Sequence, residues 1–234
     1  ATKNEGMNRK ASVFVVSGTR KDTLAVTQEA ASRLQFAVGK EKLELVLVEA
    51  ATFTRKEYSS YYSHEVKLDS FYISAFEITN ALWKEVTGGL PYDTMDNAIR
   101  TSSLITAPEL SVNYVTFTDV TRRFLPALKE KLKLDFRLPT EAEWEFAARG
   151  GKLSKGYLYS GGSTLDDVAW NYSNSNSRKH PPGQLKANEL GLYDMSGNLS
   201  EWCGDWYDVY PSGLVVNPTG PATGTQKVDR KSVV

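Results

Sequence analysis

The C-terminal part of the chain shows almost no hydrophobic periodicity, and this constrains the fold more than any other feature. From Gly156 onward the sequence is rich in Gly, Ser, Asn, Asp and aromatic residues. Neither the 3.6-residue period of an amphipathic helix nor the two-residue alternation of a half-buried strand is sustained there. The pattern predicts a long irregular half with only a few short strands, without internal repeats or low-complexity tracts.

Strand signals are confined to the first third of the chain. Residues 11–17 (ASVFVVS) are β-branched and aromatic, and residues 42–48 (KLELVLV) alternate before becoming fully apolar. Residues 65–73 (EVKLDSFYI) alternate again. Residues 24–38 carry spaced apolar side chains that fit either a helix or a loop with a strand at its end, and the pattern does not separate the two.

Two helices are predicted from their N-terminal signals. Thr79 is a candidate N-cap for a short helix over residues 80–87, which the following Gly-Gly pair closes. Thr118 is a candidate N-cap for a helix that runs to about Lys131, while residues 90–108 are loop-like. The apolar stripe of this second helix has a spacing of four residues: Val120, Phe124 and Leu128.

A third helix begins with a capping box. The Thr140 hydroxyl can accept the Glu143 amide, and the Glu143 carboxylate can accept the Thr140 amide. Glu141, Glu143 and Glu145 could suggest acid–base chemistry, but acids in a first helical turn complement the helix dipole, which explains them better. We expect Arg137 to form an ion pair inside the domain.

Composition excludes several classes of function. The 234 residues include 28 Lys+Arg and 28 Asp+Glu, so no net field favours nucleic acid or an anionic membrane. No window approaches the ~18 apolar residues of a spanning helix. The single cysteine, Cys203, excludes an intrachain disulfide and a Cys-rich zinc site. We expect neither a nucleic-acid partner nor a membrane span.

Two long motifs resemble the formylglycine-generating enzyme family, also called the sulfatase-modifying factor family. Residues 136–151 read FRLPTEAEWEFAARGG, and residues 191–207 read GLYDMSGNLSEWCGDWY. Residues 76–80 (FEITN) and 217–221 (NPTGP) add to the resemblance, which extends over residues 43–228. It implies an α+β, C-type-lectin-like fold with little regular secondary structure, two to three helices and short antiparallel strands.

The resemblance also implies a domain organisation. Residues 1–40 form an N-terminal extension with a possible strand, and residues 41–234 form the sulfatase-modifying-factor-like domain in a C-terminally shortened form. In this fold the final strands complete a sheet, so a chain that stops at Val234 would leave an edge bare. Residues 11–17 are the candidate to cover part of that edge, from the same chain or from a neighbouring copy, and a separate outer strand is the alternative.

Family members bind calcium at a turn that this chain shares. The resemblance assigns the side chains of Asp194 and Glu201 and the backbone carbonyls of Gly197 and Leu199 as ligands of a structural calcium ion. Hard oxygen donors on a tight turn suit Ca²⁺. The alternative is a turn in which Asp194 only caps local backbone groups.

A second family calcium site is expected to be absent. It would use Asn171 and the Tyr172 carbonyl, but residues 173–184 contain no Asp or Glu. Asn171 is then better explained as a residue that hydrogen-bonds in a turn or in the core.

The catalytic part of the family pattern is not matched. Catalytic members carry two closely spaced cysteines that bind copper after the position of Val228, and Cys203 lies elsewhere, so we expect no copper. His64 and His180 lie far apart and do not supply the histidine cluster of the iron-dependent sulfoxide synthases. We therefore predict a non-catalytic binding or scaffold module, with a formylglycine-generating oxidase as the alternative if the natural chain extends beyond Val234.

Seven aromatic residues crowd one third of the chain and are predicted to be mostly core, with exposed members offering a ligand-binding face. They are Trp170, Tyr172, Tyr193, Trp202, Trp206, Tyr207 and Tyr210. The expected partner is a protein or a glycan, and the sequence does not determine the oligomeric state. By the resemblance we expect an exported bacterial protein, periplasmic or at the cell surface with its leader removed, and a cytoplasmic location is the alternative.

Overall fold

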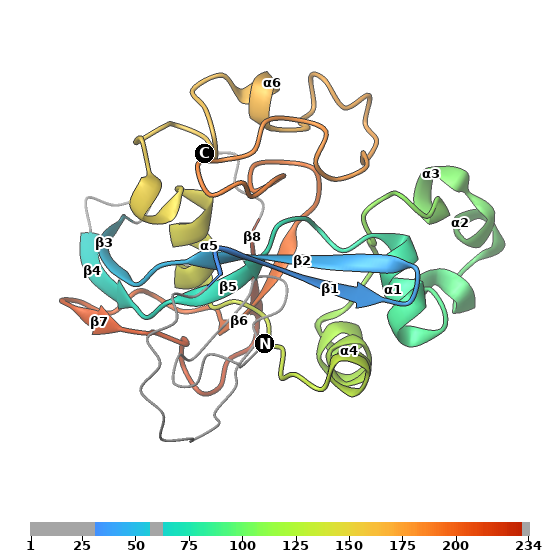
Figure 1. Ribbon diagram of the computed structural model, residues 1–234, viewed down its shortest axis with the longest axis horizontal. Coiled ribbons are helices and arrows are strands. Elements are labelled where there is room, and N and C mark those ends of the chain that lie inside the picture. The colour runs from blue at the N-terminus through green and yellow to red at the C-terminus, as the bar shows by residue number, and fades with distance from the viewer. Residues whose placement is uncertain (1–30, 57–62, 231–234) are drawn as a thin grey trace.

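A computed structural model describes residues 31–56 and 63–230 as a mixed α+β fold (Figure 1). The predicted strand at residues 11–17 lies outside the described residues. No helix in the described part of the chain is long and apolar enough to cross a membrane. The α+β, low-regularity class predicted from sequence is confirmed.

Eight strands in the described part of the chain form three small sheets. The first has the order β1-β2-β5, the second β3-β4-β7, and the third pairs β6 with β8. All neighbours are antiparallel except the short β4–β7 pair. The strands are β1 Arg33–Val38, β2 Glu41–Val48, β3 Ala51–Lys56, β4 Ser63–Leu68, β5 Phe71–Ser74, β6 Glu201–Trp206, β7 Val215–Val216 and β8 Lys227–Arg230.

The first hairpin crosses the predicted domain boundary. β1 pairs with β2 from Arg33↔Val46 to Val38↔Glu41, so the end of the ambiguous segment 24–38 is a strand. The segment 65–73 contains parts of two strands, β4 and β5, which lie in different sheets. The described fold therefore begins ten residues before Glu41.

Six α-helices are present in the described residues, more than the two to three predicted. Three have eight residues and coincide with the three helix signals, while the others have four or five residues and are too short to show a period in sequence. They are α1 Asn80–Thr87, α2 Asn97–Thr101, α3 Ser103–Thr106, α4 Leu125–Leu132, α5 Glu141–Ala148 and α6 Leu165–Val168. The segment 90–108 is therefore not a simple loop.

Helix caps confirm two predictions and correct one. The Thr79 side chain accepts the Leu82 amide at the start of α1, and the Thr140–Glu143 capping box is complete at α5. Thr118 makes no capping bond, because the chain is already helical there. Thr116 caps instead, through reciprocal bonds with Asp119 that precede a π-helical turn, Asp119–Phe124, leading into α4.

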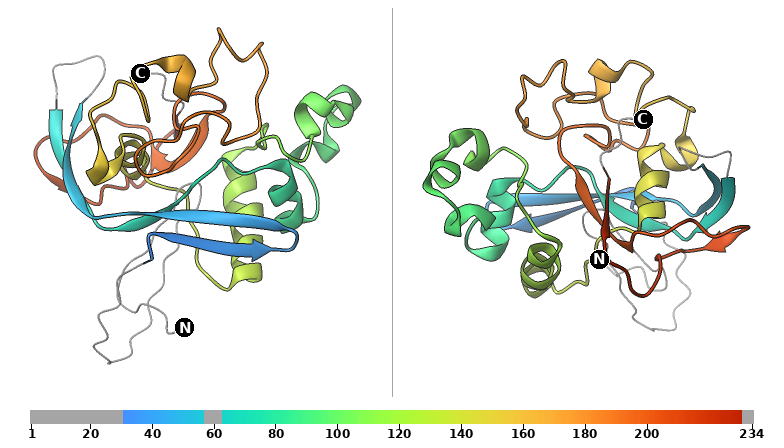
Figure 2. Two further views of the ribbon diagram at one scale, coloured as in Figure 1. Left: turned by 45° about the horizontal axis from the view of Figure 1, so that its top comes forward. Right: turned by 180° about the vertical axis from the view of Figure 1, so that it is seen from behind.

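One sheet separates two hydrophobic cores. Alternate side chains of β2 and β5 point to opposite faces, because successive residues of a strand do so. One face packs against α1 and α4, and the other against α5 (Figures 1 and 2). The first core includes Leu43, Leu45 and Tyr72, and the second includes Val46, Val48, Phe71 and Ile73.

Candidate functional site

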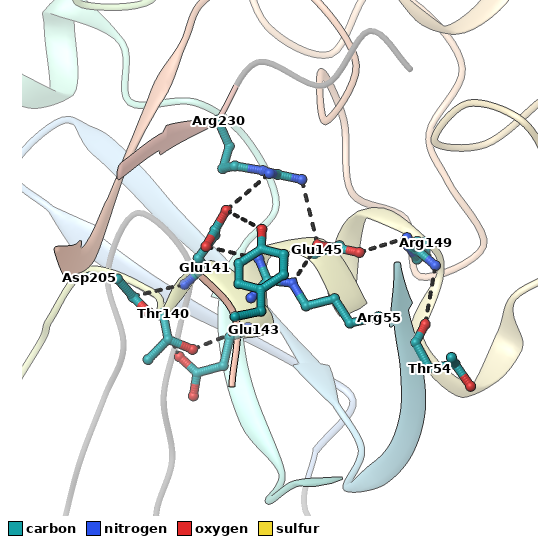
Figure 3. Close-up of polar contacts among 10 residues, drawn as sticks. Thr54, Arg55, Thr140, Glu141, Glu143, Glu145, Arg149, Asp205 and Arg230 are labelled. Atoms are coloured by element: carbon teal, nitrogen blue, oxygen red, sulfur yellow. Dashed lines mark hydrogen bonds and ion pairs between the residues drawn. The ribbon is translucent and has the colours of Figure 1, made fainter. Parts of the chain in front are cut away.

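Two acidic residues of α5 are joined by one buried arginine. Glu141 and Glu145 lie one helical turn apart, and Arg55 reaches both of them from β3 (Figure 3). Arg55 Nη2 lies 2.9 Å from Glu141 Oε2, and Arg55 Nε donates to Glu145 Oε2 over 2.8 Å. Burial alone would lower the pKa of Arg55, but the two carboxylates raise it overall. The guanidinium therefore stays charged inside the fold.

Two further groups complete this network. Arg230 of β8 donates to Glu141 Oε1 over 3.0 Å, and its other terminal nitrogen lies 3.6 Å from Glu145 Oε2. Tyr210 donates to Glu141 Oε1 over 3.0 Å, and the Arg55 guanidinium stacks 3.8 Å from the Tyr210 ring centroid. We call Arg55, Glu141, Glu145, Tyr210 and Arg230 the α5 network. Sequence reasoning missed Arg55 and Arg230 because no local pattern marks them.

An open cavity of about 1070 Å³ lies against the α5 network. Its walls are one face of α5, the loop of residues 154–160, the segment 207–210 and the strand β8. Three exposed side chains stand at its rim: Tyr207 (69% exposed), Leu158 (62%) and Tyr157 (43%). The cavity thus combines a fixed charged wall with an apolar rim.

The predicted calcium ligands lie on one tight turn. Asp194 has φ 57° and Gly197 has φ 95°, and a Cβ at residue 197 would lie 2.4 Å from the Trp170 carbonyl oxygen. The turn therefore requires glycine at that position. Asp194 Oδ2 accepts the Gly183 amide over 2.7 Å, and Glu201 Oε2 accepts the Trp144 indole over 2.7 Å.

The acidic groups at this turn are buried together. Burial raises the pKa of Glu201 to about 7, with the Asp194 charge acting in the same direction. Burial and the charges of Glu201 and Asp194 raise the pKa of Glu77 well above its ordinary value. Glu77 accepts the Leu199 amide over 3.0 Å and the Asn198 side chain over 2.6 Å, so it holds the turn in place.

The turn also carries two backbone carbonyl oxygens that were assigned as ligands. Among the described residues, no donor reaches the carbonyl oxygens of Gly197 and Leu199, which leaves both available. No three Asp, Glu, His or Cys side chains converge at metal-binding distance within the described part. An ion here would therefore rely on Asp194, Glu201 and the two carbonyls. Sequence reasoning missed Glu77, although it lies in the FEITN motif.

Asn171 forms local hydrogen bonds, as predicted for a turn residue. Its side-chain oxygen accepts the Ser173 amide over 2.8 Å, and its side-chain nitrogen donates to Asp166 over 2.7 Å. Tyr172 is 94% exposed. Asn171 therefore organises a turn.

Cys203 is fully buried in the second core. Burial raises the pKa of its thiol well above the ordinary value, and the negative charges of Asp205 and Glu141 add to the effect. Since the thiolate is the form that binds metal and attacks electrophiles, this environment opposes both reactions.

The two histidines have separate surroundings. His64 is buried on β4 with its ring 5.4 Å from that of Tyr210. His180 stacks on Trp170 with centroids 3.7 Å apart and bonds to the Ser175 carbonyl oxygen. The structure does not bring them together as a metal-binding pair.

The prediction that the seven clustered aromatics are mostly core is wrong. Tyr172 and Tyr207 are exposed, and the other five are only half-buried. The fully buried aromatics come from the regular half, where sheets and helices surround them: Phe71, Tyr72, Trp83, Tyr92, Phe124 and Trp144. An irregular half cannot enclose large rings as completely, so it presents them at its surface.

Comparison with known proteins places this geometry in a family. The model of the sulfatase-modifying factor enzyme 1-like domain matches residues 31–231. The solved Treponema denticola variable protein 1 superposes with a TM-score of 0.73 at 28% identity, covering 86% of this chain and 87% of that one.

Two curated relatives differ in how far they match. Chaperone protein LppX of Paenibacillus barcinonensis is 34% identical over 203 residues, covering 70% of this chain and 72% of that protein. The formylglycine-generating enzyme of Streptomyces coelicolor is 36% identical over 109 residues, covering 40% of this chain and 34% of the enzyme. The match to the enzyme is thus limited to part of each chain.

Proposed function

The chain belongs to the sulfatase-modifying factor enzyme 1-like family, and from this premise we propose a non-catalytic module that binds a protein ligand. The binding site is the cavity beside α5, and a structural calcium ion at the turn of residues 194–201 supports the fold. The observation that carries the proposal is the cavity itself, which places exposed apolar side chains around a fixed charged wall. A protein ligand is favoured over a glycan because the relative LppX is named a chaperone.

The burial of Cys203 supports the proposal that the module is non-catalytic. A formylglycine-generating oxidase needs two thiolates for Cu(I), and this sequence has one thiol, which is buried and has a pKa raised by that burial. We expect no turnover of a Cys-x-Pro-x-Arg peptide in the presence of copper and oxygen. Conversion of that peptide would overturn this part of the proposal.

The cavity is tested with peptides selected from a random displayed library against the whole chain. Binding of the selected peptides, measured by fluorescence anisotropy, should fall at least about tenfold in Tyr207→Ser and in Leu158→Ser, because both remove apolar rim area. Tyr172→Ser is the matched control, since Tyr172 is exposed but does not line the cavity. Equal loss in all three variants, or in none, would contradict the assignment.

The calcium site is tested by thermal unfolding. Asp194, Glu201 and the carbonyls of Gly197 and Leu199 would hold the ion, and the ion would supply the positive charge that the buried carboxylates lack. Added Ca²⁺ should raise Tm by mass action and chelator should lower it. Glu201→Gln should abolish this response, whereas Glu65→Gln at an exposed position should keep it. A melting curve that is insensitive to both chelator and Glu201→Gln would refute the site.

A further inference from the structure

At the cavity wall, the acidic side chains of α5 lie deeper than the arginines that pair with them. The side chains of Glu141 and Glu145 are 11% and 7% exposed. Those of Arg230 and Arg149 are 27% and 45% exposed. All four residues line the cavity. The wall therefore presents guanidinium groups, more than carboxylates, to whatever enters the cavity.

Arg149 and Arg230 contact the same carboxylate from different elements (Figure 3). Arg149, at the C-terminal end of α5, places its Nη2 atom 2.6 Å from Glu145 Oε1. Arg230, on β8, places its Nη2 atom 3.6 Å from Glu145 Oε2. Each oxygen of one carboxylate thus has a guanidinium beside it. The two guanidiniums are therefore close enough for a single carboxylate to bridge them.

Both guanidiniums keep donors for a ligand, since each has five N–H groups. Arg230 uses Nη1 on Glu141 and Nη2 on Glu145. Arg149 uses Nη2 on Glu145, and its Nη1 donates to the Thr54 carbonyl oxygen over 3.5 Å. Each of these terminal nitrogens carries two hydrogens, so each retains a second donor beyond these contacts. The contacts hold the two side chains in place without exhausting them.

We propose that the ligand of this cavity carries a carboxylate, which Arg149 and Arg230 bind together. The inference rests on the proposed function, because it names the chemistry of the ligand in the same cavity. A planar guanidinium matches a carboxylate in a two-point geometry and forms charge-assisted hydrogen bonds with it. We call Arg149 and Arg230 the carboxylate site. The ligand approaches this site from the cavity, and Glu145 holds it from the side of α5.

The charge of the cavity lining favours a carboxylate over a phosphate. The lining contains four basic and five acidic residues, so it has no positive excess. A phosphate brings about −1.5 to −2 charges at neutral pH, which this lining does not offset. A carboxylate brings one charge, and the spare donors of two arginines suit it.

The rim indicates what stands beside that carboxylate. Tyr157, Leu158 and Tyr207 are exposed around the same cavity. Apolar area of this kind contributes affinity when an apolar side chain of the ligand covers it. The ligand is therefore a peptide with an apolar residue next to an acidic residue or next to its free C-terminus.

The ligand side of the contact is tested with modified peptides. Peptides selected against the whole chain are resynthesised with each Asp or Glu replaced by its amide and, separately, with an amidated C-terminus. One of these changes should weaken binding at least about tenfold, because charge-assisted hydrogen bonds are lost. Loss on C-terminal amidation identifies the terminal carboxylate, and loss at one Asp or Glu identifies a side chain. If no change weakens binding, the proposal is overturned.

The protein side is tested with Arg149→Met, which should weaken binding of the unmodified peptide by a similar factor. Arg149→Lys keeps a charge beside Glu145 but lacks the planar fork, so its affinity should lie between the two. The neutralised peptide should bind Arg149→Met and the natural sequence equally, because its partner group is already absent. Arg178→Met is the matched control, since Arg178 is exposed and does not line the cavity. Equal losses in Arg149→Met and Arg178→Met, or additive losses on combining Arg149→Met with the neutralised peptide, would overturn the pairing.

A small probe separates this inference from the proposed function. N-acetyl-tyrosine carries a carboxylate and an aromatic ring, and N-acetyl-tyrosinamide lacks only the charge. At equal ionic strength, the acid alone should shift the Nε–H resonances of Arg149 and Arg230 in NMR spectra of the full chain. If it does so while no selected peptide binds, the proposed function fails and the carboxylate site stands. If peptides bind whatever their charge and the two probes act alike, the carboxylate site fails and the peptide site stands.

Discussion

Arg55 is the residue on which the α5 network depends most. Its guanidinium contacts both Glu141 and Glu145, and its side chain is only 5% exposed. A buried carboxylate without a partner is costly, because the charge has been removed from water. One arginine thus neutralises two acids that face the cavity.

Replacing Arg55 should therefore be severe. Arg55→Met should lower the free energy of unfolding in urea by about 3–5 kcal/mol, because it leaves buried carboxylates with reduced compensation. Lys56→Met, at the adjacent exposed position, should change it by less than about 0.5 kcal/mol. The double variant Arg55→Met/Glu145→Gln should recover part of the lost unfolding free energy, because it also removes one of the unpaired carboxylates. A double variant that is less stable than Arg55→Met would argue against the Arg55–Glu145 pairing.

At the scale of elements, α5 depends on its first turn. Thr140 accepts the Glu143 amide, and Glu143 also pairs with Arg137 through two bonds of 2.9 and 2.8 Å. Thr140→Ala should cost about 1–2 kcal/mol in chemical unfolding, since it removes this cap. Thr164→Ala is the control, because Thr164 precedes α6 without a capping bond and should cost little. Similar costs at both positions would contradict the role of the cap.

Lys179, in the irregular half of the chain, forms hydrogen bonds with the segment of residues 105–113. Lys179 donates to the carbonyls of Ile105 and Ser111 and to Asn113 over 2.9, 2.6 and 2.9 Å. Burial lowers its pKa from 10.5 to about 8. Between these two values the unfolded chain holds a proton that the folded chain has released, so the contribution of Lys179 to stability rises with pH.

Lys179→Met should therefore destabilise the protein more at pH 10 than at pH 7.5. The loss is measured as the difference in unfolding free energy between the natural sequence and the variant, from urea titrations at each pH. A difference that does not change with pH, or that shrinks as pH rises, would contradict the lowered pKa.

The sequence predicted those elements whose signals are local. The capping box at Thr140, the cap at Thr79 and the alternating apolar runs were read correctly, because neighbouring residues encode them. The cap before the π-helical turn lies at Thr116, two residues before the predicted Thr118. Helices α2, α3 and α6 were missed because they are too short to show a hydrophobic period. The α5 network could not be predicted, because Arg55 and Glu145 are 90 residues apart and meet only in the folded chain.

For the whole molecule, the shared sheet links two cores into one cooperative unit. Leu45→Ala in the first core and Leu68→Ala in the second should each cost about 2–5 kcal/mol. Both should shift a single transition, with tryptophan fluorescence and far-UV circular dichroism giving the same midpoint. Leu104→Ala, at a position 52% exposed, should leave it unchanged. Separate transitions for the two cores would contradict the coupling.

The separation of buried wall from exposed rim also affects how the protein can evolve. Helix α5 contributes side chains both to the second core and to the cavity wall. Substitutions on this helix can therefore affect both the packing of the core and the shape of the cavity. The rim residues Tyr157, Leu158 and Tyr207 lie on loops and are exposed, so their substitution should change the stability of the fold little. Under the proposed function, mutations there should change which ligand is bound at almost no cost in folding, so the same scaffold can acquire a new specificity.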